Sequence, residues 1–151
     1  RAGVAMRLLV DADSMPPRVR SIIARAASRY DLEAVFVANR SLPLPREGGT
    51  MIVCDDADAW IAEAVREDDL AVTRDVPLAA RIVERGAEVI TDRGEHYTSE
   101  NIGPRLSERE FAMRMRDAGE IMPAGRPYGS RELSAFANAL DRELEARNRG
   151  A

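Results

Sequence analysis

The chain has 151 residues, of which 45% are hydrophobic and 32% charged, and its formal net charge is -4 at pH 7. This length and composition are typical of one globular domain with a sizeable core. We expect a single domain over residues 1–151, with an α/β core at 1–92 and a loop and helical part at 93–151. The chain lacks an apolar run of about 18 residues and a leader-like N-terminus, which favours a cytoplasmic protein without a membrane span.

The basic and metal-binding residue types exclude several chemistries. All 22 basic residues are arginines, so Schiff-base catalysis and the lysine of a Walker A phosphate loop are excluded. One cysteine, Cys54, and one histidine, His96, are too few for a zinc site of the His/Cys kind. A bound metal would therefore have oxygen ligands. The negative net charge argues against nucleic-acid binding over the whole surface, but a local arginine patch stays open.

Short β-branched runs alternate with helical segments over residues 1–92, which predicts a mostly parallel sheet of four or five strands with crossover helices. The predicted strands are Leu8–Val10, Ala34–Ala38, Met51–Cys54, Leu70–Thr73 and Glu88–Thr91. The predicted helices of this part are Pro17–Ser28, Ala57–Arg66 and Pro77–Arg85. Prolines in plausible first turns support the helix starts, and Gly86 is the expected end of the third helix.

The last third of the chain indicates loops and two further helices, Glu108–Ala118 and Arg131–Ala146. Ser107 and Glu110 have the spacing of a capping box at the start of the first of these helices. Gly119 is expected to end it.

Aspartates follow four of the five predicted strands. They are Asp11, Asp13, Asp55, Asp56, Asp58, Asp75 and Asp92. Because parallel strands present their carboxyl ends at one edge of a sheet, these side chains should converge into one acidic crevice. Carboxylates held close together raise one another's pKa values, and a divalent cation removes that conflict.

Helix capping is the alternative, because aspartate is a favoured N-cap residue and helices follow three of these strands. Capping would account for Asp13, Asp75 and one of Asp55 and Asp56. It leaves Asp11 and Asp58 unexplained. The Asp-Arg-Gly sequence at 92–94 is typical of a turn.

Several segments resemble known families. Asp58–Ala64 and Leu70–Ala79 look like the core of PIN-domain nucleases. Four segments more closely resemble the YaiI/YqxD family of bacterial proteins, a PIN-like group: Val10–Asp13, Val37–Leu42, Thr73–Ala79 and Arg93–Thr98. The likeness runs from Met6 to the final helix. It departs after the first acidic pair, where the family usually has Cys-Pro and this chain has Ser14-Met15-Pro16, so that the proline remains and the cysteine does not.

The resemblance implies a PIN-like three-layer sandwich with C-terminal helices and a site for Mg²⁺ or Mn²⁺. Asp11, Asp58 and Asp75 match the acids that bind metal in active PIN nucleases, and Asp13 would add a fourth. The implied reaction is phosphodiester hydrolysis, with RNA favoured over DNA and these three acids catalytic. Thr73 would hydrogen-bond the scissile phosphate or a bound water, although a structural role at the strand end is equally open.

Other polar residues are candidates for nucleic-acid contacts. Asn39 and Ser41 follow the second strand at the same edge, where a turn role is the alternative. Arg93 and His96, in a predicted loop after the fifth strand, would contact phosphate or stack on a base. For His96, a place in a surface turn is the alternative.

Two groups of arginines remain near the C-terminus. Arg126 lies within, and Arg131 just after, the segment Met122–Gly129, which is the best candidate for a lid. The penultimate helix carries Arg105, Arg109, Arg114 and Arg116. Acids interleave with these four, so a solvated face of mixed charge is the default interpretation.

Two other functions stay open. A non-catalytic PIN-like module would use the crevice to bind nucleic acid or a protein. A haloacid-dehalogenase-like phosphatase would use Asp11 as its nucleophile, although that chemistry normally needs a lysine, which the chain lacks. The sequence leaves assembly into a homo-oligomer open as well.

Overall fold

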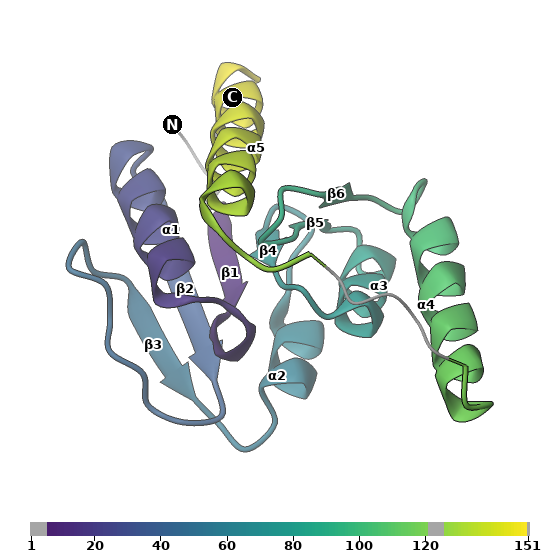
Figure 1. Cartoon of the computed structure of the whole chain (residues 1–151). Coiled ribbons are helices and arrows are strands. Elements are labelled where there is room, and N and C mark those ends of the chain that lie inside the picture. The colour runs from purple at the N-terminus through teal and green to yellow at the C-terminus, as the bar shows by residue number, and fades with distance from the viewer. Residues whose placement is uncertain (1–5, 121–125, 151) are drawn as a thin grey trace.

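A single six-stranded sheet forms the centre of the computed structural model, which describes residues 6–120 and 126–150 (Figure 1). The strands are β1 (Arg7–Asp11), β2 (Glu33–Ala38), β3 (Thr50–Val53), β4 (Leu70–Val72), β5 (Glu88–Ile90) and β6 (His96–Tyr97). Their order is β3-β2-β1-β4-β5-β6, with β1 to β5 parallel and β6 antiparallel to β5. The sixth strand was not predicted, because two residues are too short a run to show any periodicity.

Helices cover both faces of the sheet. They are α1 (Pro17–Arg29), α2 (Ala57–Ala64), α3 (Val76–Glu84), α4 (Ile102–Asp117) and α5 (Ser130–Arg149), with a short 3-10 helix, η1 (Ala12–Ser14), after β1. Helices α1 and α5 lie on one face, and α2 and α3 lie on the other, with α4 beyond α3 (Figure 1). This α/β arrangement is the three-layer sandwich expected of a PIN-like protein. Among residues 6–120 and 126–150, no helix combines the length and apolar composition needed to cross a bilayer.

Alternation along the buried strands decides which face each side chain meets. Leu8 and Val10 of β1 belong to the core beneath α1 and α5, whereas Leu9 belongs to the core beneath α2 and α3. The same period of two directs Asp11, the last residue of β1, toward α2 and α3. Strand β4 pairs in register with β1, so Thr73, the residue after β4, is level with Asp11.

The start of α4 corrects one prediction. The helix begins at Ile102, earlier than predicted, and Ser107 and Glu110 lie inside it, so the predicted capping box is wrong. Pro104 lies in the first turn, where its missing N–H breaks no helical hydrogen bond. Gly119 follows the helix with φ 84°, as predicted.

The Asp-Arg-Gly turn lies between β5 and β6. The N–H of Gly94 donates to the carbonyl oxygen of Thr91 over 3.0 Å. Gly94 has φ 85°, and a Cβ atom there would come within 2.7 Å of the carbonyl oxygen of Ala135 in α5. Glycine is therefore required at this position, because α5 passes directly over the turn.

Candidate functional site

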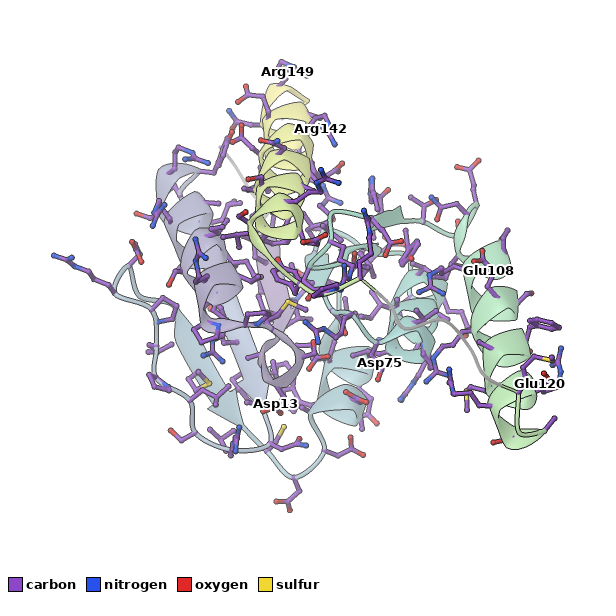
Figure 2. The ribbon with its side chains drawn as sticks, in the orientation of Figure 1. Asp13, Asp75, Glu108, Glu120, Arg142 and Arg149 are labelled. Carbon is purple, nitrogen blue, oxygen red and sulfur yellow. The ribbon has the colours of Figure 1, made fainter. Side chains whose placement is uncertain are left out.

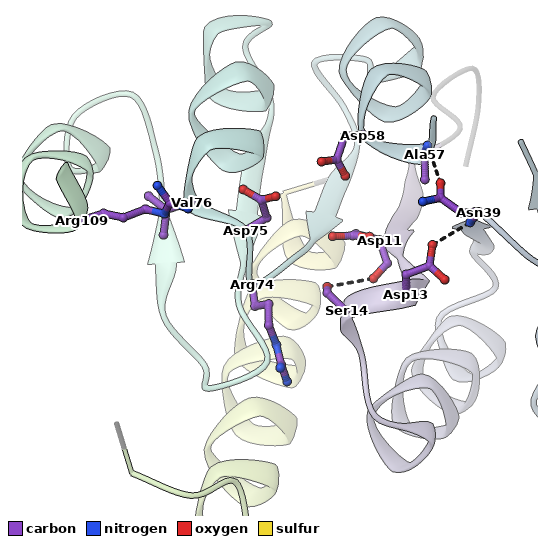
Figure 3. Close-up of a pocket in the computed structure, with 10 residues that line it drawn as sticks. All are labelled: Asp11, Asp13, Ser14, Asn39, Ala57, Asp58, Arg74, Asp75, Val76 and Arg109. Carbon is purple, nitrogen blue, oxygen red and sulfur yellow. Dashed lines mark hydrogen bonds between the residues drawn. The ribbon is translucent and has the colours of Figure 1, made fainter. Parts of the chain in front are cut away.

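A pocket of about 380 Å³ opens at the carboxyl ends of the parallel strands (Figure 3). It is lined by Asp11, Asp13, Ser14, Asn39, Ala57, Asp58, Arg74, Asp75, Val76 and Arg109. Figure 2 shows Asp13 and Asp75 at this edge of the molecule, with Arg142 and Arg149 of α5 at the opposite end. The four aspartates come from the end of β1, η1, the first turn of α2 and the N-terminus of α3. We call this cavity the acidic pocket.

Asp11 is the most deeply buried acid of the acidic pocket, with only 5% of its surface exposed. Its Oδ2 accepts a hydrogen bond from the hydroxyl of Thr73 over 2.7 Å. Burial raises the pKa of Asp11, and the charges of Asp58 and Asp75 raise it further, while the bond from Thr73 opposes these effects. Asp11 forms no ion pair with any of the described residues, so its ionised form is disfavoured in this site.

Asp58 and Asp75 face Asp11 from the starts of two helices (Figure 3). Burial raises the pKa of Asp58, and the neighbouring charge of Asp75 adds to that shift. Oδ1 of Asp75 accepts from the N–H of Leu78 over 3.1 Å, so Asp75 is the N-cap of α3. Its backbone N–H also donates to the hydroxyl of Thr73 over 3.1 Å. Thr73 thus connects two of the three facing acids.

The capping alternative holds for some of the aspartates only. Asp75 caps α3, and Asp56 caps α2 by accepting from the N–H of Ala59 over 3.0 Å. Asp13 does not cap α1, because Pro16 is the N-cap residue of that helix. Asp58 lies in the first turn of α2 and is not its N-cap.

Hydrogen bonds of Asp13 and Asn39 connect the segments that follow β1 and β2 with the start of α2. The backbone N–H of Asn39 donates to Oδ2 of Asp13 over 2.6 Å. The side-chain oxygen of Asn39 accepts from the N–H of Ala57 at the start of α2 over 2.9 Å. Both residues line the acidic pocket, whereas Ser41 is exposed and does not.

Three predicted members of the acidic crevice lie elsewhere. Asp55 and Asp56 are exposed outside the acidic pocket, and Asp92 is 2% exposed. The carboxylate of Asp92 accepts a hydrogen bond from Arg74, which neutralises its charge. Asp92 therefore positions Arg74. It does not belong to the group of facing acids, Asp11, Asp58 and Asp75.

Two arginines that were not predicted as site residues also line the acidic pocket. Arg74 lies between Thr73 and Asp75 in the chain, and its side chain points away from Asp75 in Figure 3. Arg109 reaches the pocket from α4 and is partly buried. The sequence could not identify Arg109, because acids surround it along α4 and only the packing of α4 on α3 selects the inward face.

The predicted nucleic-acid contacts near the C-terminus are more scattered. Arg93 lines a neighbouring pocket, donates to the carbonyl oxygen of Arg126 over 2.6 Å and stacks on the ring of Tyr128. Arg126 and Arg131 are exposed and line neither this pocket nor the acidic one. Of the candidate lid Met122–Gly129, residues 122–125 lie outside the described part of the chain.

His96 lies in β6 and not in a loop, which corrects its predicted location. Its Nε2 is 2.8 Å from Oε1 of Glu88, and its Nδ1 is 3.8 Å from Oε1 of Glu143. Within residues 6–120 and 126–150, this is the one group of three acid, histidine or cysteine side chains whose ligand atoms all lie within 4.8 Å of one another. Arg147 contacts both glutamates, at 3.4 Å from Glu88 and 2.8 Å from Glu143, and balances their charge. The group therefore joins α5 to the sheet as an ion-pair network.

Comparison with known proteins identifies the relatives of this chain. Residues 9–146 match the model of a family described as "Uncharacterized BCR, YaiI/YqxD family". A Myxococcus xanthus relative, named UPF0178 protein, is 44% identical over 144 residues, which cover 92% of this chain and 94% of the relative. A Treponema pallidum protein of the same name is 46% identical over 143 residues, covering 91% of this chain and 81% of that protein. No solved structure matches the chain. The chain belongs to the YaiI/YqxD family, as its resemblance predicted.

Proposed function

We propose that this protein is a divalent-metal-dependent nuclease that hydrolyses phosphodiester bonds, with RNA favoured over DNA. The observation that carries the proposal is the burial of Asp11 opposite Asp58 and Asp75, with the pKa values of Asp11 and Asp58 raised. A purely structural carboxylate at this depth is normally paired with a cation or saturated with donors. The free-energy cost of burying a carboxylate without a cationic partner, when it arises in an open pocket, is typical of a functional site.

The donor set fits a hard divalent cation. Asp11, Asp58 and Asp75 would hold Mg²⁺ or Mn²⁺, with Asp13 as a further ligand. Asp11, Asp58 and Asp75 do not all lie within 4.8 Å of one another, as Glu88, His96 and Glu143 do. Mg²⁺ keeps several of its waters when proteins bind it, so not every acid has to contact the ion directly. When bound, the ion supplies Lewis-acid chemistry that activates water for attack on phosphorus and stabilises the charge of the transition state.

The other residues of the acidic pocket would support this reaction. Thr73 fixes Asp11 and the backbone of Asp75, so that the two acids keep their positions as the substrate enters. Arg109 and Arg74 bring positive charge to a pocket that would otherwise repel a phosphodiester. Guanidinium groups also match phosphate oxygens in geometry, which favours nucleic acid over an uncharged substrate.

The test is a cleavage assay on pooled RNA and DNA with Mg²⁺ or Mn²⁺, run with the wild type, Asp11→Asn and Asp55→Asn. Asp55 is the matched control, because it is an exposed aspartate at the same edge that does not line the acidic pocket. We expect Asp11→Asn to lose cleavage and Mn²⁺ binding, measured by calorimetry, while Asp55→Asn retains both.

Each alternative function gives a different result. A non-catalytic binding module would bind nucleic acid, give a silent Mn²⁺ titration and leave all substrates intact. A phosphatase acting through Asp11 would release inorganic phosphate from small phosphoesters and form a trappable aspartyl-phosphate. Either result, or equal cleavage by the wild type and Asp11→Asn, would overturn the nuclease proposal.

A further inference from the structure

A second pocket of about 230 Å³ adjoins the acidic pocket and has the opposite character. Three arginines line it, Arg74, Arg93 and Arg105, with the acids Asp92 and Glu95. The two pockets share Arg74 and Val76, so they adjoin at the start of α3. We call this cavity the arginine pocket.

The acids of the arginine pocket are already engaged. Asp92 is almost completely buried and paired with Arg74. Glu95 accepts a hydrogen bond from the hydroxyl of Thr91 over 3.3 Å. The net charge of the lining side chains is therefore positive, with three guanidinium groups against two carboxylates. This contrasts with the acidic pocket, where aspartates outnumber arginines.

Among the described residues, Arg105 is the guanidinium of the arginine pocket that is paired with neither a carboxylate nor a carbonyl oxygen. Arg74 is paired with Asp92, and Arg93 donates to the carbonyl oxygen of Arg126. Arg105 is only partly exposed and forms no ion pair with any residue of 6–120 and 126–150; its close polar neighbour is the hydroxyl of Tyr97, whose pKa it lowers. A partly buried guanidinium that is not paired with a charged acceptor is well placed to receive one from a ligand.

A neighbouring hydroxyl is also unsatisfied. The hydroxyl of Tyr97 is buried and makes no well-formed hydrogen bond with any residue of 6–120 and 126–150, although Glu95 and Arg105 are its close polar neighbours. Burial raises its pKa, Glu95 raises it further and Arg105 lowers it, so the hydroxyl lies close to the wall of the arginine pocket. A buried hydroxyl without a partner costs free energy, which a polar ligand or an ordered water would recover.

Helix α4 serves both pockets. Arg105 and Arg109 are four residues apart, which places them on one face of α4, one turn from each other. Arg109 lines the acidic pocket and Arg105 lines the arginine pocket. The helix thus presents one guanidinium to each pocket, with Arg74 between them.

We propose that the arginine pocket binds a phosphate of the substrate strand next to the scissile phosphate, so that a nucleic-acid strand crosses from the acidic pocket over Arg74 to Arg105. The inference rests on the proposed nuclease function and adds the path of the strand and a residue that recognises it. Recognition of phosphate is independent of base identity, so the contact raises affinity without selecting a sequence. RNA and DNA share this chemistry, and both are included in the test.

The first experiment follows inorganic phosphate binding by NMR in metal-free buffer containing EDTA, so that it does not depend on the acidic pocket holding a metal. We expect phosphate to shift the Nε–H signal of Arg105 and the amide signals of Gly94 and Glu95. The variant Arg105→Gln should lose these shifts. Arg116→Gln is the matched control, because Arg116 is an exposed arginine of the same helix that lines neither pocket.

The second experiment measures binding of labelled single-stranded RNA and DNA oligonucleotides against salt concentration in Ca²⁺. Loss of one phosphate contact should lower affinity similarly for all base sequences and reduce the slope of log K against log salt by roughly 0.7. We expect this for Arg105→Gln and an unchanged slope for Arg116→Gln. Arg74→Gln is less suitable, because it would leave the buried carboxylate of Asp92 unpaired.

The outcomes separate the two proposals. Cleavage by the wild type together with unchanged phosphate shifts and salt slope in Arg105→Gln would overturn the arginine-pocket proposal and leave the nuclease function standing. Phosphate binding that depends on Arg105, with no cleavage of any substrate, would support the arginine pocket and overturn the nuclease function. Absence of phosphate shifts in the wild type would overturn the arginine-pocket proposal whatever the cleavage assay shows.

Discussion

The hydroxyl of Thr73 donates to Oδ2 of Asp11 over 2.7 Å across two neighbouring strands of the sheet. The hydroxyl oxygen of Thr73 accepts from the backbone N–H of Asp75, so this one side chain holds two acids of the acidic pocket. Both alternatives raised by the sequence for Thr73, a site residue and a structural residue at a strand end, are compatible with this geometry.

Replacing Thr73 separates these alternatives. Thr73→Val keeps the shape of the side chain but removes the hydroxyl, and loss of a hydrogen bond that orients a metal ligand typically costs 10–100-fold in metal affinity. We expect a loss of about this size in a calorimetric Mn²⁺ titration. Thr73→Ser keeps the hydroxyl and should bind nearly as the wild type. Equal affinity in all three proteins would show that Thr73 has no role in the metal site.

Removing the charge of Asp11 should stabilise the metal-free protein. The folded-state pKa of Asp11 is raised, so the stability associated with its protonated form is present below the ordinary carboxyl pKa near 4 and is lost as the pH rises through the folded value. At pH 7 the ionised carboxylate therefore opposes folding. We expect Asp11→Asn to raise the free energy of unfolding in urea by about 0.5–2 kcal/mol, the usual size of a single stabilising substitution.

The pH dependence of that gain provides its check. The difference in unfolding free energy between Asp11→Asn and the wild type should increase as the pH rises above about 4 and then level off. Added Mn²⁺ should stabilise the wild type and leave the variant unchanged. If Asp11→Asn is less stable than the metal-free wild type at pH 7, the ionised carboxylate of Asp11 does not oppose folding.

A buried ion pair at the other end of the sheet should affect stability alone. Nε and Nη2 of Arg7 donate to Oδ1 and Oδ2 of Asp69 over 3.0 and 2.8 Å, and Asp69 is 0% exposed. Asp69→Ala would leave the guanidinium of Arg7 buried without its partner, at a cost of about 3–5 kcal/mol.

The readout is urea unfolding, with Mn²⁺ affinity of the folded protein as a control that should not change. Replacing both partners with apolar residues, Arg7→Met with Asp69→Leu, should recover most of the loss, because no buried charge remains. A single variant as stable as the wild type would show that the pair contributes nothing to stability.

Two glycines offer a matched pair for backbone strain. Gly94→Ala combines φ 85° with a Cβ only 2.7 Å from the carbonyl oxygen of Ala135, so it should destabilise the protein by about 1–3 kcal/mol. Gly103 lies in α4 with nothing within 4 Å of its Cβ position. Gly103→Ala should therefore be neutral or stabilising, by up to about 1 kcal/mol. Thermal unfolding of both variants tests whether α5 lies as close to Gly94 as the structure indicates. Similar melting temperatures for the two variants would show that it does not.

The strands and most helices of the core could be predicted from sequence, because apolar periodicity and proline and glycine positions are local signals. The edge of the sheet at which the acids gather also followed from parallel strand direction. Strand β6 and the start of α4 could not be predicted, since both depend on contacts that the local sequence does not encode.

Sequence alone determined the family, the α/β class, the absence of lysine chemistry and the candidacy of Asp11, Asp58 and Asp75. Only the tertiary structure decided which aspartates face one another, because helix capping, ion pairing and burial all use the same residue type. It assigned Asp92 to Arg74 and Asp56 to a helix cap, and it brought Arg105 and Arg109 of α4 to two adjoining pockets. The physical reason is that charge patterns along a helix are ambiguous until packing selects the face that is buried.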